Sequence, residues 1–192
     1  MKKQLLSLSV IAMTSMPVMA SDFYVVADLG RSKFEVDSDS KSETAFSLGG
    51  GYKFNNNFAI EVAYRDFGEI SESYEENLGG GDFYREKYTF GASALQVSLV
   101  ASLPISQSVN LYGRLGIADM DFEASESYEF SWDGEMDQDS ASGSVSKNKT
   151  VFGVGIGYAV TPALSLRAEY SQYDKWEELE ISTVSAGIAY QF

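Results

Sequence analysis

The sequence contains no cysteine and no histidine, and only 3 of its 192 residues are proline. Without cysteine, an exported domain has no disulfide framework and must be stabilised by other means. Without histidine or a cysteine nucleophile, the chain lacks the side chains that enzymes most often use for acid–base and nucleophilic chemistry near neutral pH. We therefore expect a protein that is not an enzyme.

Basic residues and long apolar runs are also scarce. The chain has 14 basic and 28 acidic residues, and such an acidic balance disfavours binding to the phosphates of nucleic acids. Beyond residue 20 no segment approaches 18 consecutive apolar residues, so no membrane-spanning helix is predicted. The acidic segments 35–43 and 119–140 do not have the spacing of an EF-hand loop. We predict no metal site and no cofactor, with a divalent-cation site in these segments as the alternative.

The first 20 residues have the organisation of a secretory signal peptide. Lys2 and Lys3 precede an apolar stretch from Leu5 to Met13, and small residues close the segment at Ala20. The apolar stretch is shorter than the roughly 20 residues that a spanning helix requires. We expect cleavage after Ala20, which leaves residues 21–192 as a single exported domain.

Alternation of apolar with small or polar residues recurs along this domain, and this period is typical of half-buried strands. The chain is rich in glycine, with 17 residues, and in aromatic residues, with 12 tyrosines and 12 phenylalanines. The alternating segments cover residues 22–34, 44–54, 58–67, 95–103, 109–115, 150–160, 164–170 and 181–192. Eight such segments match the smallest transmembrane β-barrel.

The connections between these segments alternate in length. Short connections are predicted at residues 55–57, 104–108 and 161–163, and long polar loops at residues 35–43, about 67–88, 119–149 and 172–180. Outer-membrane barrels have short periplasmic turns and long extracellular loops. The order of connections therefore predicts an all-β fold, an eight-stranded antiparallel up-and-down transmembrane barrel.

The polar face of the segments distinguishes a membrane barrel from a soluble one. It carries mainly glycine, serine and alanine with a few charges, whereas the surface of a soluble barrel would carry many more lysine and glutamate residues. A narrow lumen of eight strands requires small residues beside a few large ones. The aliphatic face ends in aromatic residues on both sides, as a lipid-facing band with two aromatic girdles does. We predict that the apolar face contacts lipid.

The chain resembles the OmpA-like transmembrane barrels of Gram-negative bacteria, a group that includes the small OmpX and Ail adhesins. The resemblance covers the whole exported domain. Its more specific motifs are "GYAVTPALSLRAEY" and the terminal "AYQF", and "FYVVADLG", "FAIEVAYRDFG" and "LYGRLG" accompany them. The resemblance implies an outer-membrane location. We expect the chain to lack the peptidoglycan-binding domain that follows the barrel in OmpA.

The resemblance also implies a set of charged residues in the lumen: Glu61, Arg114, Arg167 and Glu169. A charge in a narrow barrel must be paired or hydrated, and these two acids and two bases can neutralise one another. In OmpA such a network, with a further lysine and glutamate, is proposed to gate a small pore. Here Ser102 and Gly157 stand near those positions, so we favour a structural plug over a small ion or solute channel.

The long loops predict a surface role. Tyr128, Phe130 and Trp132 lie among acidic residues and form a candidate contact patch for a partner, with packing against strand extensions as the alternative. We therefore expect a monomeric outer-membrane protein that supports membrane integrity and displays acidic loops for adhesion. The expected partners are outer-membrane lipid and lipopolysaccharide, the barrel assembly machinery, and a host or phage surface ligand.

The last strand carries an expected assembly signal. Family members end on an aromatic residue with tyrosine two positions earlier, matched here by Phe192 and Tyr190, and the assembly machinery recognises that strand. We expect that deletion of Phe192 leaves export intact but lowers the amount of protein assembled in the outer membrane. Immunoblots of periplasmic and outer-membrane fractions measure both quantities. Normal outer-membrane levels of the truncated protein would contradict the assignment.

Overall fold

The computed structural model describes residues 22–37, 39–132 and 135–192. The predicted signal peptide, residues 1–20, lies outside the described residues. Within the described part of the chain, no helix is both long enough and apolar enough to cross a membrane.

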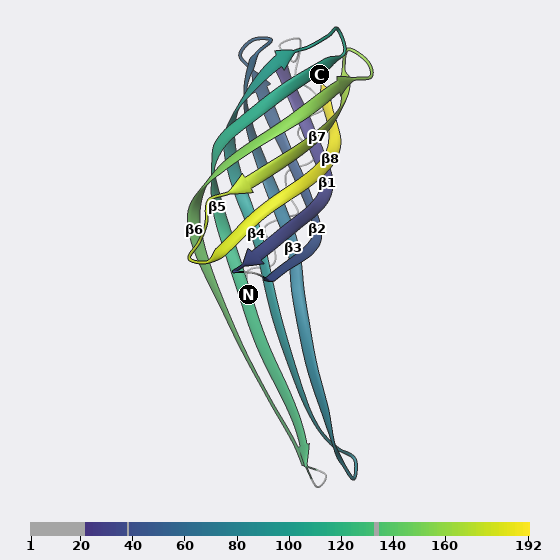
Figure 1. Cartoon of the computed structure of the whole chain (residues 1–192), viewed down its shortest axis with the longest axis vertical. Coiled ribbons are helices and arrows are strands. Elements are labelled where there is room, and N and C mark those ends of the chain that lie inside the picture. The colour runs from purple at the N-terminus through teal and green to yellow at the C-terminus, as the bar shows by residue number, and fades with distance from the viewer. Residues whose placement is uncertain (1–21, 38, 133–134) are drawn as a thin grey trace.

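Eight antiparallel strands form a closed barrel in the order in which they occur along the chain (Figure 1). Each strand pairs with the next, and β1 pairs with β8 to close the ring. The strands are β1 (Phe23–Val36), β2 (Asp39–Lys53), β3 (Phe58–Gly79), β4 (Asp82–Pro104), β5 (Val109–Trp132), β6 (Glu135–Ala159), β7 (Leu164–Tyr173) and β8 (Leu179–Gln191). The predicted fold class and topology are confirmed.

The three predicted short connections lie together at one end of the barrel, which we call the turn end. Side chains within these turns satisfy the backbone. The Asn55 side-chain oxygen accepts hydrogen bonds from the Asn57 and Phe58 amides at 2.8 and 2.9 Å, and Thr161 Oγ1 does the same for Leu164. Such side-chain caps are the reason that Asn, Ser and Thr favour tight turns.

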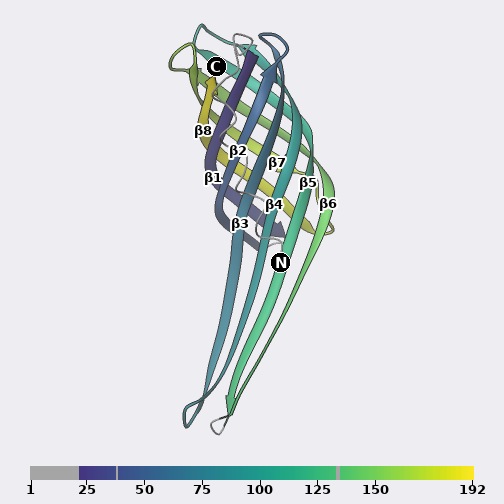
Figure 2. The ribbon, with the colours of Figure 1, turned by 180° about the vertical axis from the view of Figure 1, so that it is seen from behind.

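The predicted long loops are wrong over most of their length. Residues 69–79, 82–91, 119–132 and 135–149 continue β3, β4, β5 and β6 beyond the barrel as one four-stranded sheet. We call this sheet the extension, and the barrel end from which it projects the hairpin end (Figures 1 and 2). Residues 35–36 and 39–43 pair as the ends of β1 and β2. Residues 174–178 form a loop between β7 and β8, as predicted.

A β-bulge marks where β3 leaves the barrel. Its pairing with β4 shifts between Asp66 and Glu69, and Gly68 in the bulge has φ of +83°, a conformation that favours glycine. The Gly68 amide donates a hydrogen bond to Asp66 Oδ1 at 2.8 Å. Because the bulge adds a residue, the inward side chains change from odd positions such as Phe67 to even positions such as Ile70.

The two faces of the barrel are those that the alternation predicts. Large apolar side chains such as Leu48, Val62 and Val154 lie exposed on the outer face, where lipid surrounds an outer-membrane barrel. The interior is layered. A charged and polar layer lies between an apolar cluster at the hairpin end and a smaller one at the turn end, which contains Tyr24 and Val26.

The outward direction of Val62 gives a test of the lipid-facing band. Val62 lies between Phe58 and Tyr64 on the outer face of β3. We expect Val62→Arg to lower the free energy of unfolding by about 2 to 4 kcal/mol, because that is the usual cost of arginine near the bilayer midplane. Urea unfolding in phospholipid vesicles measures it. Ser125→Arg on the extension is the matched control, and equal losses in both variants would contradict the placement.

Candidate functional site

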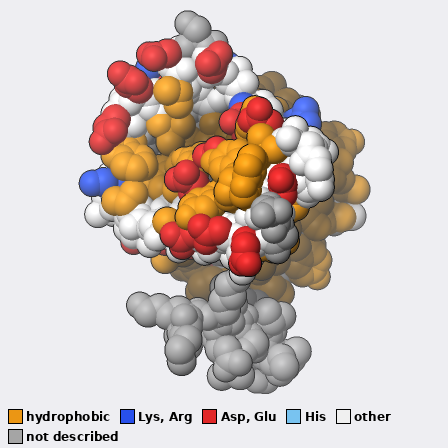
Figure 3. Space-filling model, turned by 90° about the horizontal axis from the view of Figure 1, so that it is seen from below, with side chains coloured by type: hydrophobic (Ala, Val, Ile, Leu, Met, Phe, Trp, Pro, Cys, Tyr) orange, Lys and Arg blue, Asp and Glu red, His pale blue; other side chains and the backbone are white. Residues whose placement is uncertain are grey.

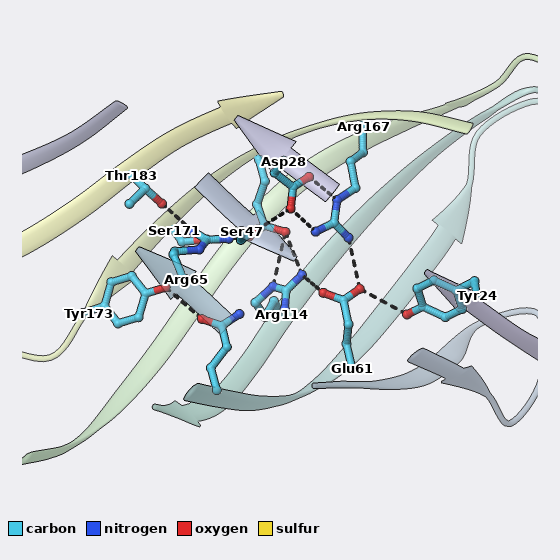
Figure 4. Close-up of polar contacts among 12 residues, drawn as sticks. Tyr24, Asp28, Ser47, Glu61, Arg65, Arg114, Arg167, Ser171, Tyr173 and Thr183 are labelled. Atoms are coloured by element: carbon cyan, nitrogen blue, oxygen red, sulfur yellow. Dashed lines mark hydrogen bonds and ion pairs between the residues drawn. The ribbon is translucent and has the colours of Figure 1, made fainter. Parts of the chain in front are cut away.

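The middle layer of the lumen contains three carboxylates and three guanidinium groups. They are buried and project from four strands, so that the barrel itself brings them together (Figure 4). The residues are Asp28 on β1, Glu61 and Arg65 on β3, Arg114 on β5, and Arg167 and Glu169 on β7. The formal charges of this lumen network cancel.

Arg167 bridges two of the carboxylates. Its Nε and Nη2 atoms donate to the two oxygens of Asp28 at 2.6 and 2.5 Å, the bidentate geometry in which a guanidinium group binds a carboxylate best. Its Nη1 atom donates to Glu61 Oε2 at 3.0 Å. Ser47 Oγ donates to the same Asp28 carboxylate at 2.7 Å. The Asp28 charge is therefore held by two strands besides its own.

Arg114 joins the other two carboxylates. Its Nη2 atom donates to Glu61 Oε1 at 2.5 Å and to Glu169 Oε2 at 3.1 Å. Glu61 thus lies between two guanidinium groups, one on each carboxylate oxygen, and Tyr24 donates a further hydrogen bond to it at 3.2 Å. The four residues predicted for the lumen lie in one connected set.

Two members of the network were not among the predicted site residues. Arg65 Nη1 donates to Thr183 Oγ1 at 2.6 Å, and its Nη2 atom lies 3.6 Å from Glu169 Oε1. Asp28 is the bidentate partner of Arg167. The strand period alone places both on the polar face. The strand period therefore identifies both residues, whereas the resemblance to OmpA implies only the other four.

Apolar side chains fill the lumen between this network and the hairpin end. Aromatic rings dominate: Phe67 and Tyr173 meet edge to face with centroids 4.9 Å apart, and Phe122 lies 4.5 Å from Trp176 of the loop between β7 and β8. Met120 and Val151 are fully buried among them. This packing leaves the polar layer covered on that side by a close-packed apolar layer.

The turn end of the lumen is more open. A cavity of about 230 Å³ extends from the turns inward to Glu61 and Arg167 and is lined by Lys53, Asn110 and Tyr112 among others. The Tyr112 ring occupies the space above Gly155, where a Cβ atom would collide with it. The cavity gives one side of the network access to solvent.

The candidate contact residues lie in a strand rather than in a loop. Tyr128, Phe130 and Trp132 all lie on β5 and on the face of the extension that continues the lumen face, which we call the inner face. Phe130 and Trp132 stack with ring centroids 6.4 Å apart. The sequence does not show clearly that these three rings alternate along a strand, because the residues between and around them are carboxylates and serines.

The opposite, outer face of the extension is polar and carries its own ion pairs. Arg85 Nη1 lies 2.9 Å from Glu129, and its Nη2 atom lies 3.1 Å from Glu75. The hydrogen bond that Arg85 donates to Glu75 and the negative charge of Glu75 raise the pKa of the Arg85 guanidinium above its ordinary value. Serines flank these residues along β5 and β6. The two faces of the extension therefore differ in chemistry.

The predicted assembly residues lie at the end of the barrel wall. Tyr190 and Phe192 are both about half exposed, and their rings meet edge to face with centroids 5.5 Å apart. The Phe192 amide donates to the Phe23 carbonyl at 3.2 Å, which continues the contact between the last and first strands. Within the described residues, no three carboxylates come close enough together to hold a metal ion.

Comparison with known proteins identifies a family model and relatives that cover most of the chain. Residues 5–192 match the family model described as the outer membrane protein beta-barrel domain. Outer membrane protein P5 of Haemophilus influenzae is 25% identical over an alignment of 175 residues, with coverage of 79% of this chain and 45% of the relative. The chain thus spans less than half the length of that curated relative.

Solved structures share the fold. Ail of Yersinia pestis, in complex with the heparin analogue sucrose octasulfate, aligns with 22% identity and a TM-score of 0.54 over 89% of this chain and 99% of Ail. Neisserial surface protein A aligns with 18% identity and a TM-score of 0.52, over 88% and 97% of the two chains. The resemblance to small outer-membrane barrels is confirmed.

The lumen network gives a test of its energetic role. We expect Arg167→Ala to lower the free energy of unfolding by about 2 to 3 kcal/mol, since it orphans Asp28; the open cavity keeps this below the 3 to 5 kcal/mol typical of buried pairs. Adding Asp28→Asn should recover part of the loss, because the second change removes the orphaned charge. Denaturant unfolding of the single and double variants measures both effects.

Lys33→Ala is the matched control for this test, because Lys33 forms an exposed ion pair with Glu35 and such pairs contribute at most about 1 kcal/mol. A loss in Arg167→Ala no larger than in Lys33→Ala would show that the network does not stabilise the barrel.

Proposed function

The chain belongs to the outer membrane protein β-barrel domain family, and from this membership we propose a structural and surface-interaction role with a closed lumen. The protein is an outer-membrane barrel of the kind represented by Ail and OmpA. Residues 1–20 act as the signal peptide and residues 21–192 as the barrel domain. The protein works as a monomer without a cofactor and catalyses no reaction.

The observation that carries the surface role is the extension. Four strands continue past the lipid-facing band as one ordered sheet, which a protein acting only within the bilayer does not require. The hairpin end faces the outside of the cell and the turn end faces the periplasm, as in other outer-membrane barrels. The extension then presents Tyr128, Phe130 and Trp132 to ligands on a host cell or a phage.

Packing supports a closed lumen. The aromatic cluster around Phe67, Phe122 and Tyr173 fills the hairpin end, and eight strands leave an interior only wide enough for side chains. Solvent enters from the turn end as far as the cavity beside Arg167. The small channel is the second candidate, and this cavity is the one feature that favours it.

Lipid and lipopolysaccharide are the proposed partners of the barrel wall. Arg31 projects outward from β1 and is exposed. It is paired in register with Val184, which pairs in turn with Tyr170 of the aromatic girdle at the hairpin end. Lys33 follows two residues further on the same face. Cations on the outer face beside this girdle pair with the phosphate groups of the lipid. The assembly machinery binds the β8 end, with Tyr190 and Phe192.

Shortening the extension tests the surface role. We expect a variant that joins Ile70 to Phe90 and Ala124 to Gly143 through Asn-Gly turns to fold as a barrel but to lose most of the cell adhesion that the full protein confers on a non-adherent bacterium. Microscopic counts of bacteria on cultured cells measure adhesion, and the different gel migration of unheated and boiled samples checks folding. Unchanged adhesion by the folded variant would refute the role.

Conductance measurements separate the channel alternative. In planar bilayers the full protein should show no steady, resolved conductance, because the aromatic cluster closes the hairpin end. Steady conductance that Arg167→Ala alters without changing stability would replace the closed lumen with a small channel.

A further inference from the structure

The inner face of the extension is a lattice in which aromatic rings alternate with carboxylates. In one row across the strands, Glu72 pairs with Tyr88 and Tyr88 pairs with Glu126. The next row toward the tips contains Tyr74, Glu86, Tyr128 and Asp139, and the row after it contains Glu76, Tyr84, Phe130 and Asp137. Every ring in these rows therefore has a carboxylate beside it.

The rings of this lattice are accessible. Tyr74 retains 57% of its exposed area and Tyr88 retains 44%, and Trp132 beyond these rows retains 57%. Tyr84, Tyr128 and Phe130 are half-buried. Viewed from the hairpin end, hydrophobic side chains gather in the middle of the molecule and acidic side chains surround them (Figure 3). No described element of the chain covers this face, so the rings are available to a partner.

Positive charge is missing from the lattice itself. Among the described residues on the inner face from Glu72 to the hairpin tips there is no lysine or arginine. Lys41 neutralises Glu72 from β2, whereas Glu126, Asp137 and Asp139 form no ion pair in the described part of the chain. Arg85 lies on the outer face and is paired there with Glu75 and Glu129. Lys147 and Lys149 of β6 lie closer to the barrel, where Lys147 contacts the Trp176 ring and Lys149 donates to the Lys175 carbonyl. The inner face therefore carries an uncompensated negative potential.

We propose that the inner face of the extension is a docking surface for a basic, arginine-rich polypeptide segment. This inference rests on the proposed surface role and names the class of partner. A guanidinium group stacks on an aromatic ring and pairs with a carboxylate at the same time. Each ring of the lattice offers both contacts, as Tyr88 does beside Glu126 and Tyr128 beside Asp139.

The spacing of the rows fits an extended segment. Rows recur at every second residue of β5, and two residues of a strand span about 6.8 Å. An extended basic segment lying parallel to the strands repeats its side chains on one face at the same distance. Basic side chains at alternate positions can therefore contact successive rows.

Charge excludes two other occupants. A second copy of this chain would bring its own acidic inner face against this one, and like charges in close contact destabilise an interface. A polyanion of the kind bound by Ail would meet the same repulsion. The lattice is suited to a cation, and the rings distinguish an arginine-rich segment from a simple metal ion.

Binding of a labelled nine-residue arginine peptide tests the proposal. Fluorescence anisotropy with the full protein in octyl glucoside, a non-ionic detergent, gives the dissociation constant. We expect about tenfold weaker binding for Tyr88→Thr/Tyr128→Thr, which leaves the net charge unchanged, and about tenfold weaker binding for Glu126→Gln/Asp139→Asn; each corresponds to about 1.4 kcal/mol. A nine-residue glutamate peptide should not bind.

The control variant is Glu69→Gln/Glu123→Gln, which removes two exposed carboxylates from the outer side of the same sheet. It should bind the arginine peptide within about twofold of the unaltered protein. Equal weakening in this control, or full binding by the tyrosine variant, would reduce the effect to general attraction toward an acidic protein and overturn the proposal. Dimers that dissociate in the tyrosine variant would identify a second copy as the occupant instead.

The peptide-binding experiment and the adhesion experiment can fail independently of each other. If the shortened extension abolishes adhesion but the arginine peptide fails to bind, the surface role stands and the basic partner is wrong. If the peptide binds as described and the shortened variant still adheres fully, the docking surface stands and adhesion is not its use.

Discussion

Closure of the hydrogen-bonded ladder is the constraint on which the rest of the structure depends. The bilayer core offers no hydrogen-bond partners, so every strand in it needs a neighbour on both sides, and the pairing of β1 with β8 supplies the last of them. With only eight strands, the closed ring leaves room for side chains alone. Any charge placed inside must then find its counter-charge inside as well, and Asp28, Glu61 and Glu169 find theirs in three arginines.

Beyond the lipid the same strands are under a different constraint. Water can satisfy the free edges of β3 and β6, so four strands continue while the other four end. The side-chain pattern changes at that boundary. On the outer face of β4, aliphatic residues such as Leu95 give way to Lys87 and Arg85, and on its inner face packed residues such as Ala92 give way to exposed rings such as Tyr88. The backbone of β4 continues across this boundary, and the change in its side chains marks where the membrane ends.

The barrel was predictable because its two faces differ in polarity at a period of two. The extension was not, because its outer face is polar and its inner face mixes aromatic rings with carboxylates. Residues 123–127, for example, are Glu-Ala-Ser-Glu-Ser and contain no large apolar side chain that would reveal the strand period. The lumen face was predictable by parity as far as Arg65. The bulge at Gly68 then reverses parity in β3, and no period identifies such a shift. The contacts of Arg167 with Asp28 and Glu61 depend on how β7, β1 and β3 curve together, which the sequence of any one strand does not contain.

The acidic residues of the extension have two physical effects that depend on each other. A projecting sheet with free edges and exposed rings is prone to pair with another copy of itself, and charged side chains on such a sheet oppose that association. The same carboxylates leave the rings uncovered, since they prevent an apolar or acidic surface from settling on them. Glu126 beside Tyr88 and Asp139 beside Tyr128 therefore do more than keep the chain soluble. Charge that discourages self-association also restricts the accessible aromatic surface to partners that carry positive charge.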